Sequence, residues 1–268
     1  MSHDRFRARY GPWAFIAGAS QGIGEAFADR LAARGLSLFL VARHAEALER
    51  TALRIRAEHG VAVRWRAMDL ASPHLIDELR PELAPLDLGL LVCNAAYGPI
   101  RPFLHNSLED LNAHLDLNCR APLLLARTFA ERLQPHGRGG MIIMSSLVGF
   151  HGTTMLGTYA ATKAFDTVLG ESLHHELRSH GIDVLVCVAG ATRTPSYLGT
   201  EPRYGWLRPS EHEAGRVADE ALRWLGRKQV HTVGARNHAT LLLLGLLGRH
   251  LASRLMSYTL TRVYRHRA

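Results

Sequence analysis

Short apolar runs alternate with longer amphipathic segments along most of the chain. The apolar runs predict buried strands, expected at Trp13–Ala19, Leu36–Ala42, Val61–Asp69, Leu88–Ala95, Gly140–Ser146, Ile182–Gly190 and Gln229–Gly234. Apolar residues at helical spacing predict helices between them, at Gly22–Arg34, Ala45–His59, Pro73–Leu83, Leu108–Leu133, Tyr159–His180 and Pro209–Leu225. This alternation predicts an α/β fold, a doubly wound sheet of about seven mostly parallel strands with helices on both faces.

Length and composition favour one structural unit. The 268 residues contain no low-complexity tract and no repeat of solenoid length. Residues 1–268 are therefore expected to form a single domain, with 236–268 as its C-terminal amphipathic helical extension. The N-terminal segment is too polar for a signal peptide, and no apolar run reaches the ~18 residues needed to cross a bilayer. Together with three scattered cysteines, this favours a cytoplasmic protein.

The charge balance is basic. The 32 Lys and Arg outnumber the 24 Asp and Glu, which gives a net charge of +8. No DNA- or RNA-reading motif accompanies the excess, so no nucleic-acid partner is expected. No spacing of Cys and His matches a zinc site, so no metal is expected either.

A glycine-rich turn, "GASQGIG", follows the first predicted strand. Gly18, Gly22 and Gly24 fall between that strand and the first helix. Glycine lets the backbone turn sharply and approach a phosphate, and the start of the helix presents free N–H groups to it. A tight turn without a ligand is the alternative, but this context favours a Rossmann-type nucleotide site.

The end of the second predicted strand selects the cofactor. An acid there would bind the ribose 2′-hydroxyl of NAD, whereas arginine favours the 2′-phosphate of NADP. The sequence reads "LVARH", with Arg43 and no acid. NADP is therefore predicted, the alternative being that Arg43 is one of many surface arginines.

The stretch "TYAATK" contains one of only two lysines in this arginine-rich chain. Tyr159 and Lys163 are four residues apart, so on a helix they share a face. A neighbouring ammonium favours the phenolate, which suits a tyrosine that exchanges a proton with a carbonyl oxygen. Ser146, at the end of a predicted strand 13 residues earlier, can hold that carbonyl.

Together these motifs resemble the short-chain dehydrogenases/reductases in their single-domain form. The resemblance covers about Trp13–Gly234. It depends on the joint order of "GASQGIG", Asp69-Leu70, "CNAAYG", Asn118, Ser146, "YAATK" and "AGATRTP".

The resemblance implies a role for each matching residue. Tyr159 would be the proton donor or acceptor, Lys163 would bind the nicotinamide ribose, Ser146 would position the carbonyl, and Asn118 would hold a water that relays protons to Lys163. The residues expected to bind the cofactor are Gly18, Ser20, Gln21, Gly22, Ile23, Gly24, Arg43, Asp69, Leu70, Asn94, Ala95, Tyr159, Lys163, Gly190, Thr192 and Thr194.

The substrate side is expected to be apolar. The segment Thr194–Pro209 resembles the mobile lid of the family, with a plain surface loop as the alternative. The expected substrate residues are Tyr97, Leu147, Met155, Tyr197 and Trp206. Most of them are hydrophobic, so a hydrophobic ketone or alcohol is predicted.

The C-terminal tail leaves three interpretations open. Leu243, Leu246, Leu247, Leu251, Leu255 and Tyr258 recur at helical spacing with arginines between them. The tail could be a helix docked on the domain, a subunit contact or a basic amphipathic helix at an anionic membrane surface, and docking or assembly is favoured. The two long predicted helices resemble those that pair subunits in the family, so a homodimer or homotetramer is expected.

Three functions follow from these observations. The leading one is an oxidoreductase that transfers hydride between NADP(H) and a carbonyl or alcohol. The alternatives are a non-catalytic dinucleotide-binding sensor or scaffold, and a membrane-surface lipid ketone reductase.

Overall fold

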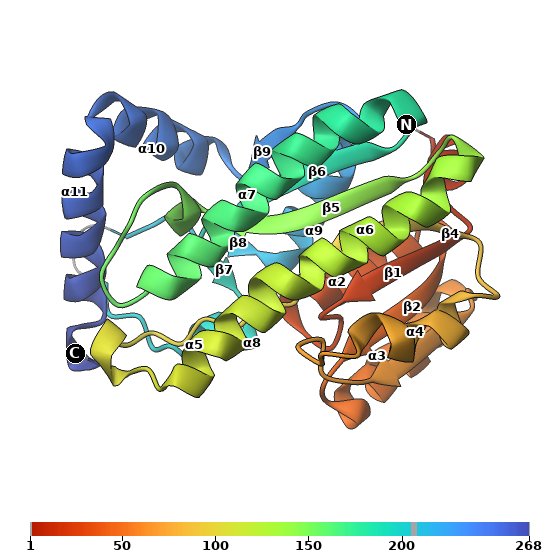
Figure 1. Cartoon of the computed structure of the whole chain (residues 1–268), viewed down its shortest axis with the longest axis horizontal. Coiled ribbons are helices and arrows are strands. Elements are labelled where there is room, and N and C mark those ends of the chain that lie inside the picture. The colour runs from red at the N-terminus through yellow and green to blue at the C-terminus, as the bar shows by residue number, and fades with distance from the viewer. Residues whose placement is uncertain (1, 205–207, 268) are drawn as a thin grey trace.

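A seven-stranded sheet forms the centre of the molecule. The computed structural model describes residues 2–204 and 208–267. The strand order is β3-β2-β1-β4-β5-β6-β9, and every neighbouring pair is parallel. The strands are β1 Trp13–Ala17, β2 Ser37–Ala42, β3 Val63–Ala67, β4 Leu88–Cys93, β5 Gly140–Ser146, β6 Asp183–Ala189 and β9 Val230–Thr232. The predicted doubly wound fold is confirmed (Figure 1).

Helices cover both faces of this sheet (Figure 1). One layer comprises α2 Gly22–Ala32, α3 Ala45–His59 and α9 Ala214–Trp224, and the other comprises α4 Leu75–Leu83, α6 Ala121–Leu133 and α7 Gly157–Leu177. Because successive strand residues point to opposite faces, Ile16 packs in the core that contains Phe27 of α2. Phe15 packs in the core that contains Phe129 of α6. All four side chains are fully buried.

Three features differ from the predicted elements. A helix α1, His3–Tyr10, precedes the first strand, and Phe6 and Tyr10 anchor it although its remaining side chains are mostly polar. The predicted helix at Leu108–Leu133 consists of α5 Leu108–Leu115, a π-helical turn Asp116–Arg120 and α6. The helix predicted from Pro209 begins at Ala214, because His212–Glu213 forms β8 and pairs with β7, Thr192–Arg193.

The C-terminal residues form two helices, α10 Ala235–Leu246 and α11 Gly248–Val263, at one edge of the molecule (Figure 1). They separate at Gly248, whose φ of 72° lies in the left-handed region that favours glycine. Among the described residues, no helix is long and apolar enough to cross a membrane.

Helix α11 packs on the α/β body through small and hydroxyl side chains. Ala252 is fully buried, Ser253 donates a hydrogen bond to the Gly152 carbonyl (2.6 Å), and the Thr154 amide donates to Ser257 Oγ (3.2 Å). At its C-terminal end, Val263 joins a small hydrophobic cluster. The tail is therefore docked, but not through the predicted stripe. Six of the stripe's side chains point outward, between 43% and 84% exposed: Leu243, Leu246, Leu247, Leu251, Leu255 and Tyr258.

Candidate active site

The glycine turn follows β1, beside β4, at the point in the sheet where the strand order reverses. Gly18 has a φ of 84°, and a Cβ there would lie 2.7 Å from the Cα of Ala95. A Cβ on Gly24 would lie 1.9 Å from the Gly18 carbonyl oxygen. The Asn94 side chain donates a hydrogen bond to that same oxygen (2.8 Å). The close approach therefore requires glycine at both positions, as the sequence predicts.

This turn has the donors that a pyrophosphate needs. Helix α2 begins at Gly22, and its N-cap residue Gln21 provides no side-chain cap, so the backbone N–H groups of the first turn remain open to a ligand. Ser20 and Ile23 belong to the same turn. The cradle and its donors fit the diphosphate of a dinucleotide.

The neighbouring strand ends carry the remaining residues predicted to bind the cofactor's adenosine half. Arg43 follows β2 directly, is exposed, and makes no ion pair with any residue that the structure describes. Asp69 follows β3 and is exposed, and its carboxylate accepts a hydrogen bond from the Ala71 amide (3.0 Å). Leu70 is buried beside it. These positions line the carboxyl edge of the sheet, where doubly wound folds bind ligands.

Tyr159 and Lys163 lie in the first two turns of α7. Nζ of Lys163 is 5.8 Å from the centroid of the Tyr159 ring. The ring lies against the backbone of Gly98, where an added Cβ would come within 2.5 Å of Cδ2. The Tyr159 hydroxyl makes no hydrogen bond with the described residues, so it can bond a ligand.

Lys163 is 4% exposed and has two protein partners. Nζ donates to the Met144 carbonyl and to Oδ2 of Asp166, both at 2.9 Å. Burial by itself lowers the pKa of Lys163, but the Asp166 carboxylate more than offsets this, so the pKa is raised and the amine stays protonated. One N–H of the ammonium remains for a ligand.

Two serines end β5, and their hydroxyl groups differ in hydrogen bonding. Ser145 is buried, and its hydroxyl bonds to the Lys163 carbonyl and to Thr167 Oγ1, both at 2.8 Å. Ser146 is only partly buried, and its hydroxyl has no hydrogen-bond partner among the described residues. Ser145 thus fixes β5 to α7 and leaves Ser146 free at the strand end.

Asn118 braces the loop after β4 against α7. It lies in the π-helical turn and is 1% exposed. Its Oδ1 accepts from the Tyr97 amide (2.8 Å), and its Nδ2 donates to the Tyr97 carbonyl (2.7 Å) and to Thr162 Oγ1 (3.0 Å). The side chain makes no direct hydrogen bond to Lys163 in the part of the chain that the structure describes.

The residues predicted to bind the nicotinamide follow β6, and Thr194 lies against the glycine turn. Thr192 is buried and donates to the Gly190 carbonyl (3.0 Å), and Thr194 caps the short helix α8, Pro195–Leu198. A Cβ on Gly22 would lie 2.8 Å from the Thr194 methyl group. Behind Gly190, the buried side chain of Asn237 on α10 fills the space that a larger residue would need.

The predicted substrate residues do not form one group. Met155 and Tyr159 line a cavity of about 10 Å³, and Leu147 lies against Gly190. Tyr197 instead bonds through its hydroxyl to Tyr204 and to Glu211.

Tyr97 directs its hydroxyl to Asp110 (2.9 Å), away from the Asn118 side chain that holds its backbone. Trp206 lies outside the described residues, and so does part of the predicted lid. A role for any of these side chains with substrate stays a prediction.

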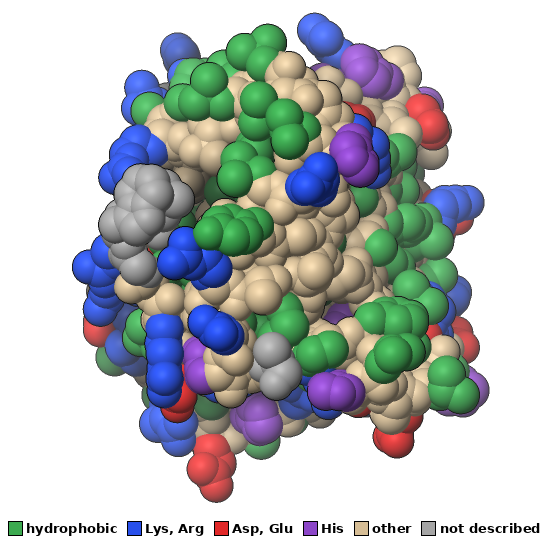
Figure 2. Space-filling model, turned by 90° about the vertical axis from the view of Figure 1, so that its left-hand side faces the viewer, with side chains coloured by type: hydrophobic (Ala, Val, Ile, Leu, Met, Phe, Trp, Pro, Cys, Tyr) green, Lys and Arg blue, Asp and Glu red, His purple; other side chains and the backbone are tan. Residues whose placement is uncertain are grey.

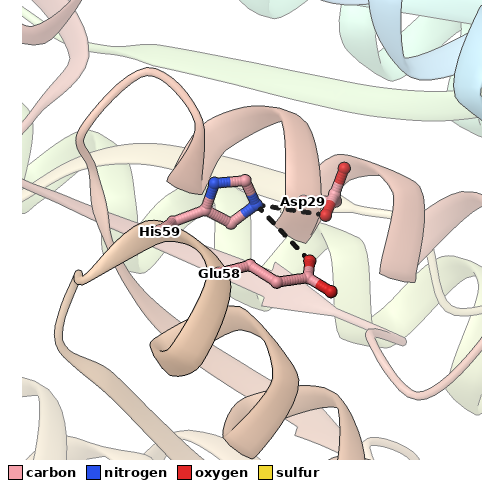
Figure 3. A group of neighbouring side chains, drawn as sticks. All are labelled: Asp29, Glu58 and His59. Carbon is pink, nitrogen blue, oxygen red and sulfur yellow. Dashed lines mark hydrogen bonds and ion pairs between the residues drawn. The ribbon is translucent and has the colours of Figure 1, made fainter.

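A separate polar cluster lies between α2 and α3, where Asp29, Glu58 and His59 converge (Figure 3). His59 is 3.2 Å from Asp29, and the Arg54 guanidinium donates to Asp29 (3.0 Å) and to Glu58 (2.7 Å). Burial alone would raise the pKa of Asp29, but hydrogen bonds from Arg54 and His59 hold it below its usual value. The arginine already balances both carboxylates, so this cluster is an ion-pair network.

A parallel sheet with a glycine cradle at its switch point defines a dinucleotide-binding protein. The tyrosine and lysine on α7 are the pair that the sequence predicts for an oxidoreductase of this kind. The short chain dehydrogenase family model matches residues 12–202. The chain belongs to this family of nicotinamide-dinucleotide oxidoreductases.

Known proteins resemble most of the chain. The 7beta-hydroxysteroid dehydrogenase of Clostridium sardiniense is 29% identical over 235 residues, which cover 87% of this chain and 89% of that protein. A solved structure of a 7beta-hydroxysteroid dehydrogenase has a TM-score of 0.86 at 27% identity and covers 94% of this chain and 98% of its own. A short-chain dehydrogenase from Sphingobium yanoikuyae, solved in complex with NADPH, has a TM-score of 0.77 at 31% identity and covers 91% and 96%.

Several residues that shape the site were missed from the sequence. Ser145 and Asn237 are separated from their partners by many residues, so no local pattern indicates their contacts. Gly98 could have been suspected from the "NAAYG" loop. Asp166 could have been found, because it lies three residues after Lys163 on the same predicted helix.

Proposed function

We propose that this protein is an NADP(H)-dependent carbonyl reductase or alcohol dehydrogenase that acts on a bulky hydrophobic substrate. The observation that carries the proposal is the pairing of Tyr159 with the buried, protonated Lys163 on α7. The cofactor supplies or accepts the hydride, and the protein supplies the proton. Each role below is part of this proposal.

Tyr159 gives a proton to the substrate oxygen in reduction and removes it in oxidation. Ser146 donates a hydrogen bond to the same oxygen and sets its distance from Tyr159. Lys163 uses its remaining N–H to hold the nicotinamide ribose, while the Met144 carbonyl and Asp166 fix the other end of the ammonium. Asn118 keeps the loop at Tyr97 and helix α7 in register.

The decisive experiment is a screen of carbonyl compounds with NADPH on the unmodified protein and on Tyr159→Phe. Turnover of hydrophobic ketones is expected, and the variant should lose about 100-fold or more in kcat because the proton donor is gone. Tyr258→Phe, which alters an exposed tyrosine of α11, is the matched control and should retain activity. If Tyr159→Phe is fully active, the proton-transfer role is wrong. If NADPH binds but no compound turns over, the protein is the non-catalytic sensor or scaffold.

Arg43 supports NADP as the cofactor, since it follows β2, is exposed and has no ion-pair partner among the described residues. Arg43→Asp is expected to weaken NADPH binding about 10-fold or more, because a charge-assisted contact to the 2′-phosphate is lost. Titration calorimetry measures this. Arg50→Asp on α3, where the side chain is 72% exposed, is the control. Equal affinity for NADH and NADPH in the unmodified protein would contradict the assignment.

The substrate class rests on the apolar residues near Tyr159. Met155 is buried in a cluster with Ile100 and Val263, and Leu147 lies beside Gly190. The 7beta-hydroxysteroid dehydrogenases among the relatives are named for a bulky and largely hydrophobic substrate, which supports the same class here. Activity confined to small charged ketones would count against it.

A second candidate places the same reaction at an anionic membrane surface. The observation that favours it is the outward leucine stripe of α10 and α11. No Asp or Glu follows Glu220, whereas that stretch contains eight arginines and one lysine. A two-fold contact between copies would set these arginines against each other, but anionic headgroups complement them. Flotation with anionic vesicles tests this candidate.

A homodimer or tetramer through the long helices α6 and α7 stays a prediction that light scattering can measure.

A further inference from the structure

Asp166 is a buried carboxylate that helps to fix the Lys163 ammonium, but the proposed reaction has given its negative charge no role. It is 2% exposed, and its Oδ2 accepts a hydrogen bond from Nζ of Lys163 at 2.9 Å. A buried ammonium needs a counter-charge, and Asp166 is the carboxylate that contacts it. Thr162 and Thr167, its polar neighbours on α7, bond to Asn118, to backbone carbonyls and to Ser145 instead.

The second carboxylate oxygen faces a small cavity. Oδ1 of Asp166 has no hydrogen-bond partner among the described residues. The cavity beside it has a volume of about 10 Å³, close to the lower limit for one water molecule. Its walls are mostly apolar: Ala17, Leu70, Cys93, Ala95, Leu117, Ala121, Pro122 and Leu125. Leu70 and Ala95 are also predicted to bind the cofactor, so the same cavity borders the Lys163–Asp166 pair and part of the predicted cofactor site.

We propose that Asp166 is a positioning residue of this active site, which holds Nζ of Lys163 and cancels part of the ammonium charge that acts on the Tyr159 hydroxyl. A lysine alone would act on the phenol as a full positive charge. A carboxylate 2.9 Å from Nζ opposes this field, so that only part of the positive charge acts on the Tyr159 hydroxyl. The pair then pulls less on the hydroxyl proton of Tyr159, the proton that a carbonyl oxygen accepts in reduction.

Burial raises the pKa of Asp166 itself, and the contact with Lys163 opposes this rise. The other titratable groups near the pair do not change the balance of charge. Cys93 on β4 and Cys119 in the π-helical turn both face it. Burial raises the pKa of Cys119 to about 11 and that of Cys93 further. Both thiols are therefore neutral over the working range. Strand β5 contributes only the Met144 carbonyl and the hydroxyl of Ser145.

The inference rests on the proposed reductase function, and a pH profile of alcohol oxidation by the holoenzyme tests it. Asp166→Asn and Asp166→Leu both remove the charge, and the leucine also fills the cavity. Each is expected to lower the apparent pKa of kcat/KM for oxidation by about one unit, because the ammonium is no longer balanced. Asp166→Glu keeps the charge and should keep the profile within a few tenths of a unit. Glu176→Gln, an exposed acid near the end of α7, is the control.

The outcomes separate this inference from the proposed function. A purely structural Asp166 would lower the melting temperature or kcat without moving the profile, and such a result overturns the inference alone. If neither neutral variant folds, the unmodified enzyme decides: an apparent pKa above about 8 is expected, and one below about 7 overturns the inference. An unmodified protein without turnover overturns the proposed function and this inference with it.

Discussion

At the scale of single residues, the position of a reactive side chain depends on the room its neighbours leave as well as on its hydrogen bonds. Tyr159 holds its orientation because Gly98 has no side chain beneath the ring. Lys163 holds its position because the Met144 carbonyl and Asp166 take two of its three donors. The sequence identifies the tyrosine and the lysine, but Gly98 and Met144, which help to fix them, come from a loop and a strand far away along the chain.

Gly98→Ala is expected to reduce kcat about 10-fold or more while the protein stays folded. The new Cβ would lie 2.5 Å from Cδ2 of Tyr159, so the phenol must move away from its productive position. Steady-state kinetics with NADPH and a ketone substrate measure the effect. Gly157→Ala is the matched control, because a Cβ there meets no atom within 4 Å. Equal losses in both variants would show that the Tyr159 contact is not the cause.

At the scale of elements, polar contacts fix pairs of helices that the hydrophobic core alone leaves free to shift. Helices α2 and α3 are joined by the network of Asp29, Arg54 and His59 (Figure 3). Helix α11 is joined to the Gly152–Met155 segment through hydroxyl groups. Both sets of contacts join segments that lie apart along the chain. Helical periodicity is a pattern within one segment, so it does not predict them.

Asp29→Asn is expected to lower the free energy of unfolding at pH 7 by about 1–2 kcal/mol, because the carboxylate loses charge-assisted hydrogen bonds. The lowered pKa of Asp29 means that this contribution is present at pH values above its unfolded value. It is lost as the pH falls through the folded value. The gap between the two proteins should therefore narrow below about pH 4.

Urea unfolding at a series of pH values measures this gap. Asp77→Asn serves as the control, because the Asp77 side chain is 78% exposed and its nearest cation is 3.7 Å away. A gap for Asp29→Asn that is constant with pH would contradict an electrostatic origin.

At the scale of the whole molecule, the C-terminal helices present two different faces. The inward face is small and hydroxyl-rich and packs against the body, while the outward face carries the exposed leucines among arginines. Figure 2 views this side of the molecule and shows hydrophobic side chains gathered near its top, with Lys and Arg around them. These leucines are exposed on two consecutive helices, and a gathered apolar surface of this kind is typical of an interaction surface.

The unmodified protein is expected to float with anionic phospholipid vesicles at low salt and less well with neutral ones. Replacing both Leu243 and Leu246 by Glu should abolish flotation, because anionic headgroups repel the new carboxylates and the apolar acyl region excludes them. Leu53→Glu on α3, where the side chain is 55% exposed, is the control. If the double variant instead halves the mass seen by light scattering and no vesicle binding occurs, the partner is a second copy.

The amino-acid sequence alone was enough to predict the sheet and most of its helices, and it indicates Tyr159, Lys163 and Ser146 as candidate reactive groups. Apolar runs and helical periodicity are local patterns, and so are the "GASQGIG" turn and the Tyr159–Lys163 spacing, because each depends on residues within a few turns of one another. The family resemblance joined them in order, and the match over residues 12–202 confirms it.

Two features depend on how the chain folds. They are the side chains that position the site residues and the face of the C-terminal helices that stays exposed. The contacts of Ser145 with Lys163, Gly98 with Tyr159 and Asn118 with Tyr97 join segments brought together by folding. Docking of the leucine stripe on the domain is one interpretation of the sequence, yet α11 packs through its opposite face, where hydroxyl groups find polar partners on the body. Periodicity shows that a helix has two faces, but the choice between them depends on what the rest of the chain places beside it.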